Sequence, residues 1–142
     1  MRNKRAVTAI CLLLGALTMY GEAFAHGTEG HGKTAEAQMQ KLHAIMPMFS
    51  VASAGLETAL GKGDAAAVEL ESGRMLAAVP DLKKSKPHRN VSQRNNFLAF
   101  ATNLEVALTS TVNLAKKGDF AGAKTSFTKV EKVCAACHAK FR

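Results

Sequence analysis

Apolar residues recur along most of this chain at the three- and four-residue steps of amphipathic helices, and strand-like alternation is rare. The pattern predicts four helices, over about residues 34–60, 65–79, 92–117 and 120–141. The first two apolar stripes comprise Met39, Leu42, Met46, Phe49, Leu56 and Leu60, and then Val68, Met75, Leu76 and Val79. The other two comprise Phe97, Phe100, Leu104, Leu108, Val112 and Ala115, and then Ala123, Phe127, Val130, Cys134, Cys137 and Phe141.

Turn signals separate these stretches. The sequences GKGD at 61–64 and KKGD at 116–119 each place a glycine where one helix ends and an aspartate where the next begins. The middle connection, PDLKKSKPHRN at 80–90, has two prolines and no apolar periodicity, which indicates a loop of about ten residues. Two tight links around a longer one predict an all-α, up-down-up-down four-helix bundle.

The N-terminal segment has the composition of a secretory signal. Basic residues, an apolar run to about Tyr20 and an A-x-A site at 23–25 match the three regions of a signal peptide. The apolar run is shorter than the ~20 residues that span a bilayer. We therefore expect a cleaved signal peptide over 1–25, a flexible lead over 26–33 and a helical domain over 34–142. This organisation predicts a periplasmic protein that does not span the membrane after cleavage.

The chain is basic, with a formal net charge of +8. Without the signal peptide, 16 basic and 10 acidic residues remain, a net charge of +6. This charge has two possible explanations: the protein binds an acidic protein partner, or its surface is simply rich in solvated lysines. The same two explanations apply to the basic residues of the connection at 80–90. No nucleic-acid-binding module is recognisable, so we expect no nucleic-acid partner. No acid–base pair or activated nucleophile stands out either, so we expect no enzyme activity from protein side chains.

Candidate chemistry lies at the C-terminus, where Cys134, Cys137 and His138 form the pentad CAACH. A C-x-x-C-H pentad is the attachment site of a c-type haem. Helical positions i and i+3 share a face, so both thiols can bond one haem, and the adjacent imidazole is placed to ligate its iron. A thioredoxin-like pair needs a β-α-β pattern, and a zinc site needs a second ligand pair; the sequence has neither. The motif predicts one covalent haem c per chain, near the C-terminal end of the last helix.

The terminal CAACHAKFR, the helical pattern and the export signal together resemble the class II c-type cytochromes, the family of cytochrome c′ and its low-spin relatives. The resemblance implies a bundle with haem c attached through Cys134 and Cys137 and with His138 as the proximal ligand. It also implies that Arg142 or Lys140 lies near the haem propionates, that redox partners are proteins and that homodimers are common. High-spin members of the family leave the sixth position open and bind small gases, whereas low-spin members carry electrons and use a methionine from the first helix.

The level of the haem motif selects candidates for that sixth position. The motif lies about 16 residues, or ~24 Å, along the last helix. The same distance back from Leu60 along an antiparallel first helix reaches about residue 44. Met46 lies at this level on the apolar stripe and is the expected distal ligand; His43, one turn earlier, is the alternative, and an open site is the third option. The low-spin family pattern of Gln followed three residues later by Met reads Gln40…His43 here, which departs from the family.

Pro47 modifies this part of the first helix. A proline inside a helix removes one N–H donor and clashes with a preceding carbonyl, so we expect a kink or a helix break beside Met46. Met48 is expected to be rotated away from the core. The main prediction is that the protein carries single electrons, with His138 and Met46 as the two axial ligands of the haem iron. The alternative is a cytochrome c′-like, five-coordinate protein that binds small gases such as NO or CO.

Overall fold

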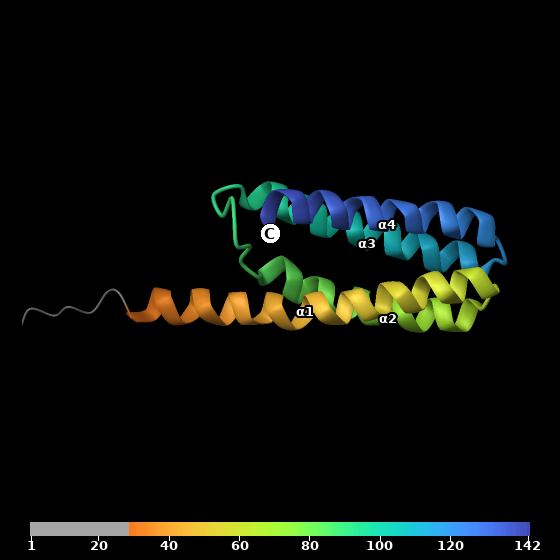
Figure 1. The fold of residues 1–142 in the computed structure, drawn as a ribbon, viewed down its shortest axis with the longest axis horizontal. Helices are drawn as coiled ribbons and strands as arrows, with labels where there is room; N and C mark the ends of the chain where they lie inside the picture. The colour runs from red at the N-terminus through yellow and green to blue at the C-terminus, as the bar shows by residue number, and fades with distance from the viewer. Residues whose placement is uncertain (1–28) are drawn as a thin grey trace, which may run out of the picture.

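The computed structural model describes residues 29–142, with side chains described from Glu36 onward. Four helices follow one another: α1 (Glu29–Lys62), α2 (Ala65–Lys84), α3 (Arg94–Lys116) and α4 (Phe120–Phe141). Figure 1 shows that the chain runs up and down through them, and no strand occurs among the described residues. The predicted all-α four-helix bundle is confirmed. The expected signal peptide lies outside the described residues, and α1 begins at Glu29 rather than at about residue 34.

The two tight links are built as the sequence predicts. Gly63 and Gly118 have φ of 68° and 80°, the left-handed region that glycine adopts without a side-chain clash. After each glycine, the next amide donates to the carbonyl five residues earlier at 3.0 Å, which closes the helix end. Asp64 and Asp119 then accept from the backbone N–H three residues further on, at 3.0 and 2.8 Å. Both aspartates are therefore N-caps, as expected.

The middle link differs from the prediction, because α2 continues through Pro80 to Lys84. Leu82 extends the buried stripe of Met75 and Val79, and its burial keeps the chain helical beyond the proline. Ser85 then ends the helix, where its hydroxyl donates to the Leu82 carbonyl at 2.7 Å. The predicted loop at 80–90 was therefore wrong at its start. The connection spans residues 85–93.

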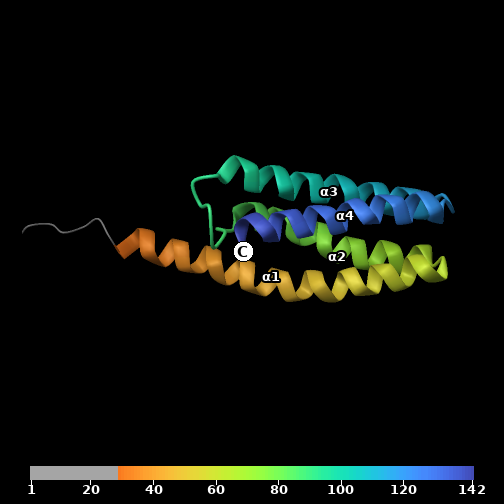
Figure 2. The same ribbon diagram turned by 45° about the horizontal axis from the view of Figure 1, so that its top comes forward.

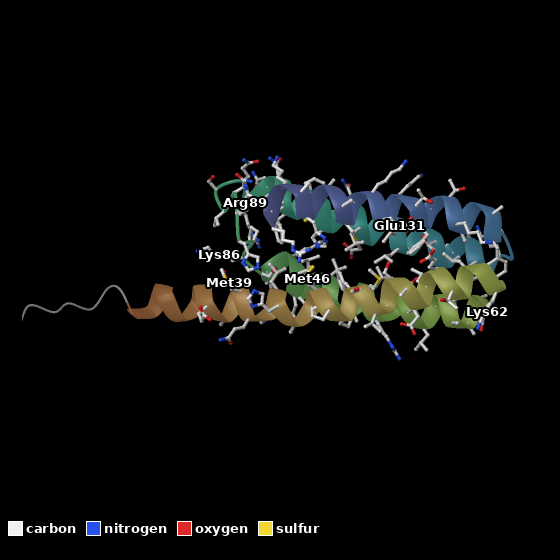
Figure 3. All side chains as sticks on the ribbon, in the orientation of Figure 1. Met39, Met46, Lys62, Lys86, Arg89 and Glu131 are labelled. Atoms are coloured by element: carbon white, nitrogen blue, oxygen red, sulfur yellow. The ribbon has the colours of Figure 1, made fainter. Side chains whose placement is uncertain are left out.

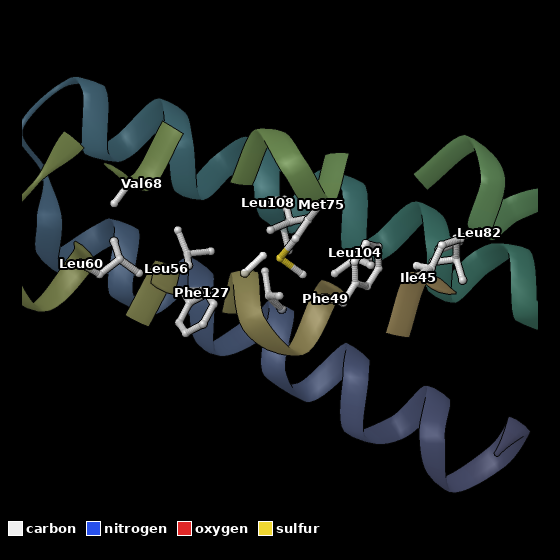
Figure 4. Packing of buried hydrophobic residues seen from close by; sticks show 14 of the residues in the cluster. Ile45, Phe49, Leu56, Leu60, Val68, Met75, Leu82, Leu104, Leu108 and Phe127 are labelled. Atoms are coloured by element: carbon white, nitrogen blue, oxygen red, sulfur yellow. The ribbon is translucent and has the colours of Figure 1, made fainter. Parts of the chain in front are cut away.

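The core follows the predicted stripes closely, although its outer members differ. Figure 4 shows the side chains of α1 and α2 meeting those of α3 and α4 in one continuous cluster. Ile45 is buried although the predicted stripe left it out, whereas Met46 is only partly buried. Fully buried side chains in the cluster include Leu56, Val68, Met75, Leu108, Ala123 and Val130.

The helices pack unevenly around this core. The pairs α3–α4, α1–α2 and α2–α3 have extensive contacts, whereas α1 and α4 contact each other sparsely. Figure 1 shows the two helices further apart at the end where the chain terminates than at the opposite end. The stretch Glu36–Lys62 of α1 is long and apolar enough to cross a membrane by composition, but its apolar side chains serve the bundle core. The sparse α1–α4 contact leaves space between these helices.

We expect Leu56→Ala to destabilise the fold strongly. Leu56 is 0% exposed within the cluster, so truncation leaves a cavity and lowers the free energy of unfolding by about 2–5 kcal/mol. Leu70→Ala is the matched control, because Leu70 is 56% exposed and its truncation should change stability by less than about 0.5 kcal/mol. Urea unfolding followed by circular dichroism measures both variants. Equal destabilisation of the two would contradict the assigned core.

Candidate functional site

The haem-motif residues lie on the last turns of α4. Cys134 and Cys137 are partly buried and pack against the core cluster, whereas His138 is exposed at the helix surface. Phe141 is buried one turn later and meets the Phe97 ring edge-on, with centroids 5.3 Å apart. This anchor fixes the rotation of α4. Both thiols consequently face the space between α4 and α1.

A cavity of about 360 Å³ lies against these thiols. All four helices line it, and most of its walls are apolar. Cys134, Cys137 and His138 form its α4 wall, and Met46 belongs to its α1 wall. The larger apolar side chains in the rest of the lining are Phe49, Met75, Leu82, Phe97, Phe100, Leu104 and Val133.

A second cavity, of about 570 Å³, adjoins the first and reaches the end of the bundle. The two share Met46, Ser50, Phe97, Cys137 and His138 in their walls. The second cavity has a more polar rim, which includes His43, His88 and Arg142. The site therefore has an apolar interior and a basic, imidazole-rich mouth.

Met46 occupies the predicted level opposite the motif. It lines both cavities together with Cys137 and His138, and Figure 3 shows it between α1 and α4, with Met39 further toward the outer end of α1. The level counted from the sequence is therefore confirmed. Met48 is also partly buried against the core, so its expected rotation away from the core was wrong, but it lines neither cavity.

Pro47 does not interrupt the helix. α1 is continuous from Glu29 to Lys62, with Pro47 inside it, so the expected break does not occur. Figure 2 shows α1 changing direction gently along its length. Pro47 is exposed and lines the mouth of the second cavity. A proline inside a helix leaves the carbonyl four residues earlier without its N–H donor, and because this side of α1 is exposed, water can bond to that carbonyl instead.

His43 lies beside His88, a neighbour that the sequence did not suggest. Its Nε2 lies 3.2 Å from Nε2 of His88, and the two rings stack with centroids 5.0 Å apart. Both imidazoles are exposed. The sequence placed His88 in the basic connection at 80–90, and nothing in it pairs two histidines 45 positions apart.

The connection at 85–93 also holds the end of α4. Arg89 N–H donates to the Phe141 carbonyl at 3.2 Å, and the Asn90 side-chain amide donates to the Lys140 carbonyl at 2.5 Å. Asn90 adopts a positive φ of 53°, a conformation that asparagine tolerates better than most residues. The last carbonyls of a helix lack intrahelical partners. The connection supplies them here, and so it positions the helix that carries the motif.

Burial raises the pKa of both thiols above their ordinary 9.0. For Cys137 the pKa reaches about 11, with a smaller contribution from neighbouring Cys134. For Cys134 the Glu131 carboxylate adds to the effect of burial. Thioredoxin-like cysteines have lowered pKa values, because the thiolate is their reactive form. This pair has the opposite electrostatics, which argues against a dithiol redox site.

In the haem-free chain we expect slow alkylation of these thiols by iodoacetamide at pH 8. Only the thiolate reacts, and the raised pKa values keep both thiols protonated in the folded chain. The rate should rise up to about pH 11, the pKa of Cys137, and unfolding in urea should restore ordinary cysteine reactivity at pH 8. Mass spectrometry over time measures both rates. Fast alkylation of the folded chain at pH 8 would contradict the burial of the thiols.

The cavity suits a large flat apolar group attached at one edge. Its volume is in the range typical of ligand pockets, and two thiols and an imidazole line one wall. Within residues 29–142, no cluster of three or more His, Cys, Asp or Glu side chains could hold a bare metal ion. A zinc site at the cysteines is therefore not supported, whereas a haem that brings its own iron fits the donor set.

Comparisons with known proteins agree with this arrangement. The family model described as Cytochrome C' matches residues 81–142, which include the end of α2, the 85–93 connection, α3 and α4. No curated protein and no solved structure matches the chain. The matched region contains the complete CAACH motif and the two helices that form one side of the cavity.

Proposed function

Because the chain belongs to the cytochrome c′ family and is therefore a c-type haem cytochrome, we propose that it carries single electrons in the periplasm. Covalently bound haem c is the cofactor that the family implies. In this proposal Cys134 and Cys137 hold one haem per chain by thioether bonds, and His138 is the proximal ligand. When bound, the haem supplies the one-electron iron couple. The aromatic and aliphatic lining excludes water from it.

One observation supports Met46 as the distal ligand: of the two α1 side chains that line both cavities with Cys137 and His138, Met46 and Ser50, Met46 is the one with a thioether that can ligate iron. Its thioether is a soft donor of the kind found with histidine in electron-carrying c-type cytochromes. His43 is the alternative. It lines only the outer cavity, and its Nε2 is close to His88.

A cytochrome c′-like gas-binding protein is the second candidate function. Met46 is only partly buried, and Phe49 and Ser50 lie beside it on the same cavity wall. If Met46 does not reach the iron, this wall leaves room for a small gas such as NO or CO. The two functions therefore depend on one side chain.

Optical and EPR spectra of the purified holoprotein distinguish the two functions. The electron-carrier proposal expects low-spin ferric and ferrous spectra, a methionine-to-iron charge-transfer band and little CO binding. High-spin spectra with ready CO or NO binding would reject it in favour of the gas binder. A low-spin spectrum without the methionine band would point to His43.

Basic residues near the cavity mouth suit an acidic redox partner. Figure 3 shows Lys86 and Arg89 at the end of the bundle where the chain terminates. Lys83 is paired with Glu105 at 2.6 Å, whereas Lys84 is exposed, so the basic segment is only partly neutralised. We propose no nucleic-acid partner, no catalysis by protein side chains and no membrane span; a homodimer is compatible with the family.

The rate of electron transfer from an acidic donor protein should fall as ionic strength rises. Screening weakens the attraction between exposed charges beyond about 10 Å at 0.1 M salt. Replacing Lys84 and Lys86 by Gln should lower the rate at low salt and flatten its salt dependence. Stopped-flow kinetics measures this, with Lys62→Gln at the opposite end of the bundle as the control. A rate independent of salt would exclude electrostatic docking at this mouth.

A further inference from the structure

His43 and His88 form a pair of exposed imidazoles that the proposed electron transfer does not use when Met46 is the distal ligand. His43 lies on α1, and His88 lies in the connection between α2 and α3. Their Nε2 atoms are 3.2 Å apart, whereas their ring centroids are 5.0 Å apart. Since the nitrogens are closer than the centroids, the Nε2 edges of the two rings converge. When both rings are in the tautomer with the proton on Nδ1, each Nε2 has a free lone pair, and the two lone pairs can approach one common point.

This separation matches two ligands of one transition-metal ion. Imidazole nitrogens bind Zn²⁺ at about 2.0–2.1 Å. Two such ligands are about 2.9 Å apart at a right angle and about 3.4 Å apart at the tetrahedral angle. The observed 3.2 Å lies between these limits. Little rearrangement of either ring is needed for both nitrogens to bind one ion.

The backbone holds His88 in place for this role. Pro87 before it is buried, and its ring restricts its own φ. Arg89 after it donates its N–H to the Phe141 carbonyl at 3.2 Å. His43 is fixed by α1, whose neighbouring Leu42 is buried in the core. Ligands that are already positioned lose less conformational entropy when a metal binds.

We propose that His43 and His88 bind a divalent transition-metal ion, Cu²⁺ more tightly than Zn²⁺, at the mouth of the haem cavity. Imidazole suits both ions, and copper is favoured by the general order of divalent affinities. Among the described residues no third His, Cys, Asp or Glu joins the pair, so water completes the coordination. The exposure of both rings lets the ion enter from solvent. A bound ion would link α1 to the 85–93 connection.

The test uses the holoprotein in a His26→Gln, His31→Gln background. The chain has five histidines, and with His138 assigned to the haem this background leaves only the proposed pair. Calorimetric titration with Cu²⁺ and with Zn²⁺ should show one ion per chain. Copper EPR of the ferric protein should show hyperfine structure from two imidazole nitrogens. Zn²⁺ should also raise the unfolding temperature, because it binds the folded pair.

Two variants identify the ligands. Adding His88→Gln, and separately His43→Gln, should each weaken Cu²⁺ binding by at least about tenfold and abolish the Zn²⁺ effect on unfolding. Circular dichroism without metal shows whether each variant retains its fold, and the two variants lie on different elements. Cu²⁺ binding that disappears in the background, or that survives both variants, overturns the proposal. These outcomes are separate from the haem spectra, so a failure here does not affect the proposed electron transfer.

Discussion

Met46→Ala is expected to convert the protein from a low-spin, six-coordinate haem to a high-spin, five-coordinate one. The methionine-to-iron band should disappear, the reduction potential should fall, and CO should bind where the parent protein binds little. The physical reason is that Met46 is the thioether that lines both cavities opposite His138, and Ala cannot replace it as an iron ligand. A thioether on the iron also raises the potential, so its loss lowers it. Optical spectroscopy, CO titration and voltammetry measure the three effects.

Met48→Ala is the matched control for this prediction. Met48 is a partly buried methionine on the same helix, two residues away, and it lines neither cavity. It should cost some stability but preserve the low-spin spectrum. His43→Ala resolves the alternative, because it should leave the methionine band intact if Met46 ligates the iron. An unchanged spectrum in Met46→Ala would exclude Met46 as the distal ligand.

Replacing Cys134 and Cys137 together by Ala is expected to eliminate covalent haem almost completely. The two thiols are the attachment points on the α4 wall of the cavity, and the double variant removes both thioether bonds. Each single variant should retain one bond and give a lower yield of holoprotein. Haem staining after denaturing electrophoresis and intact-protein mass spectrometry show whether haem is covalently attached, and the pyridine haemochrome spectrum, which shifts when a vinyl group is left unreacted, distinguishes two bonds from one.

Cys11→Ala is the control, because Cys11 is the third cysteine of the chain and belongs to the expected signal peptide. It should leave haem attachment unchanged, and the mature mass should be the same as that of the parent. Covalent haem in the double variant would show that the attachment site lies elsewhere. A measured mass that corresponds to a mature chain beginning before residue 26 would correct the predicted cleavage site.

Much of the fold could be predicted because its determinants are local. The caps at Asp64 and Asp119 and the terminating glycines before them act within one turn of the chain, and their signals were correct. The predicted end of α2 was wrong because Pro80 is a strong local signal for the end of a helix. The burial of Leu82, which overrides this signal, is a tertiary effect. Local preference is weak compared with apolar burial in a packed core. At Pro47 the sequence predicted a kink or a break: the helix continues through the proline, so the break was wrong, whereas α1 does change direction along its length.

In the candidate site, too, some features could be predicted from local sequence and others depended on tertiary packing. CAACH is contiguous, so its haem chemistry could be read without any knowledge of packing. The level of Met46 followed from counting along two antiparallel helices, because the rise per residue is constant. The rotation of α1 about its own axis could not be predicted as reliably. Ile45 is buried although the predicted stripe left it out, and Met48 packs against the core although it was expected to face away from it. Rotation depends on how side chains of neighbouring helices interdigitate.

The sequence by itself therefore determined a bundle of four helices, its tight turns and a haem-attachment motif at its end, because each of these depends on residues within a few positions of one another. Only the tertiary structure decided the shape of the cavity between α1 and α4, the docking of the 85–93 connection on the end of α4 and the meeting of His43 with His88. The contacts of the connection and of the histidine pair join residues 45 to 52 positions apart, and the cavity brings Met46 together with Cys137, which is 91 positions later. They form because packing of the whole core sets the distance and rotation of each helix, and no short segment contains that information.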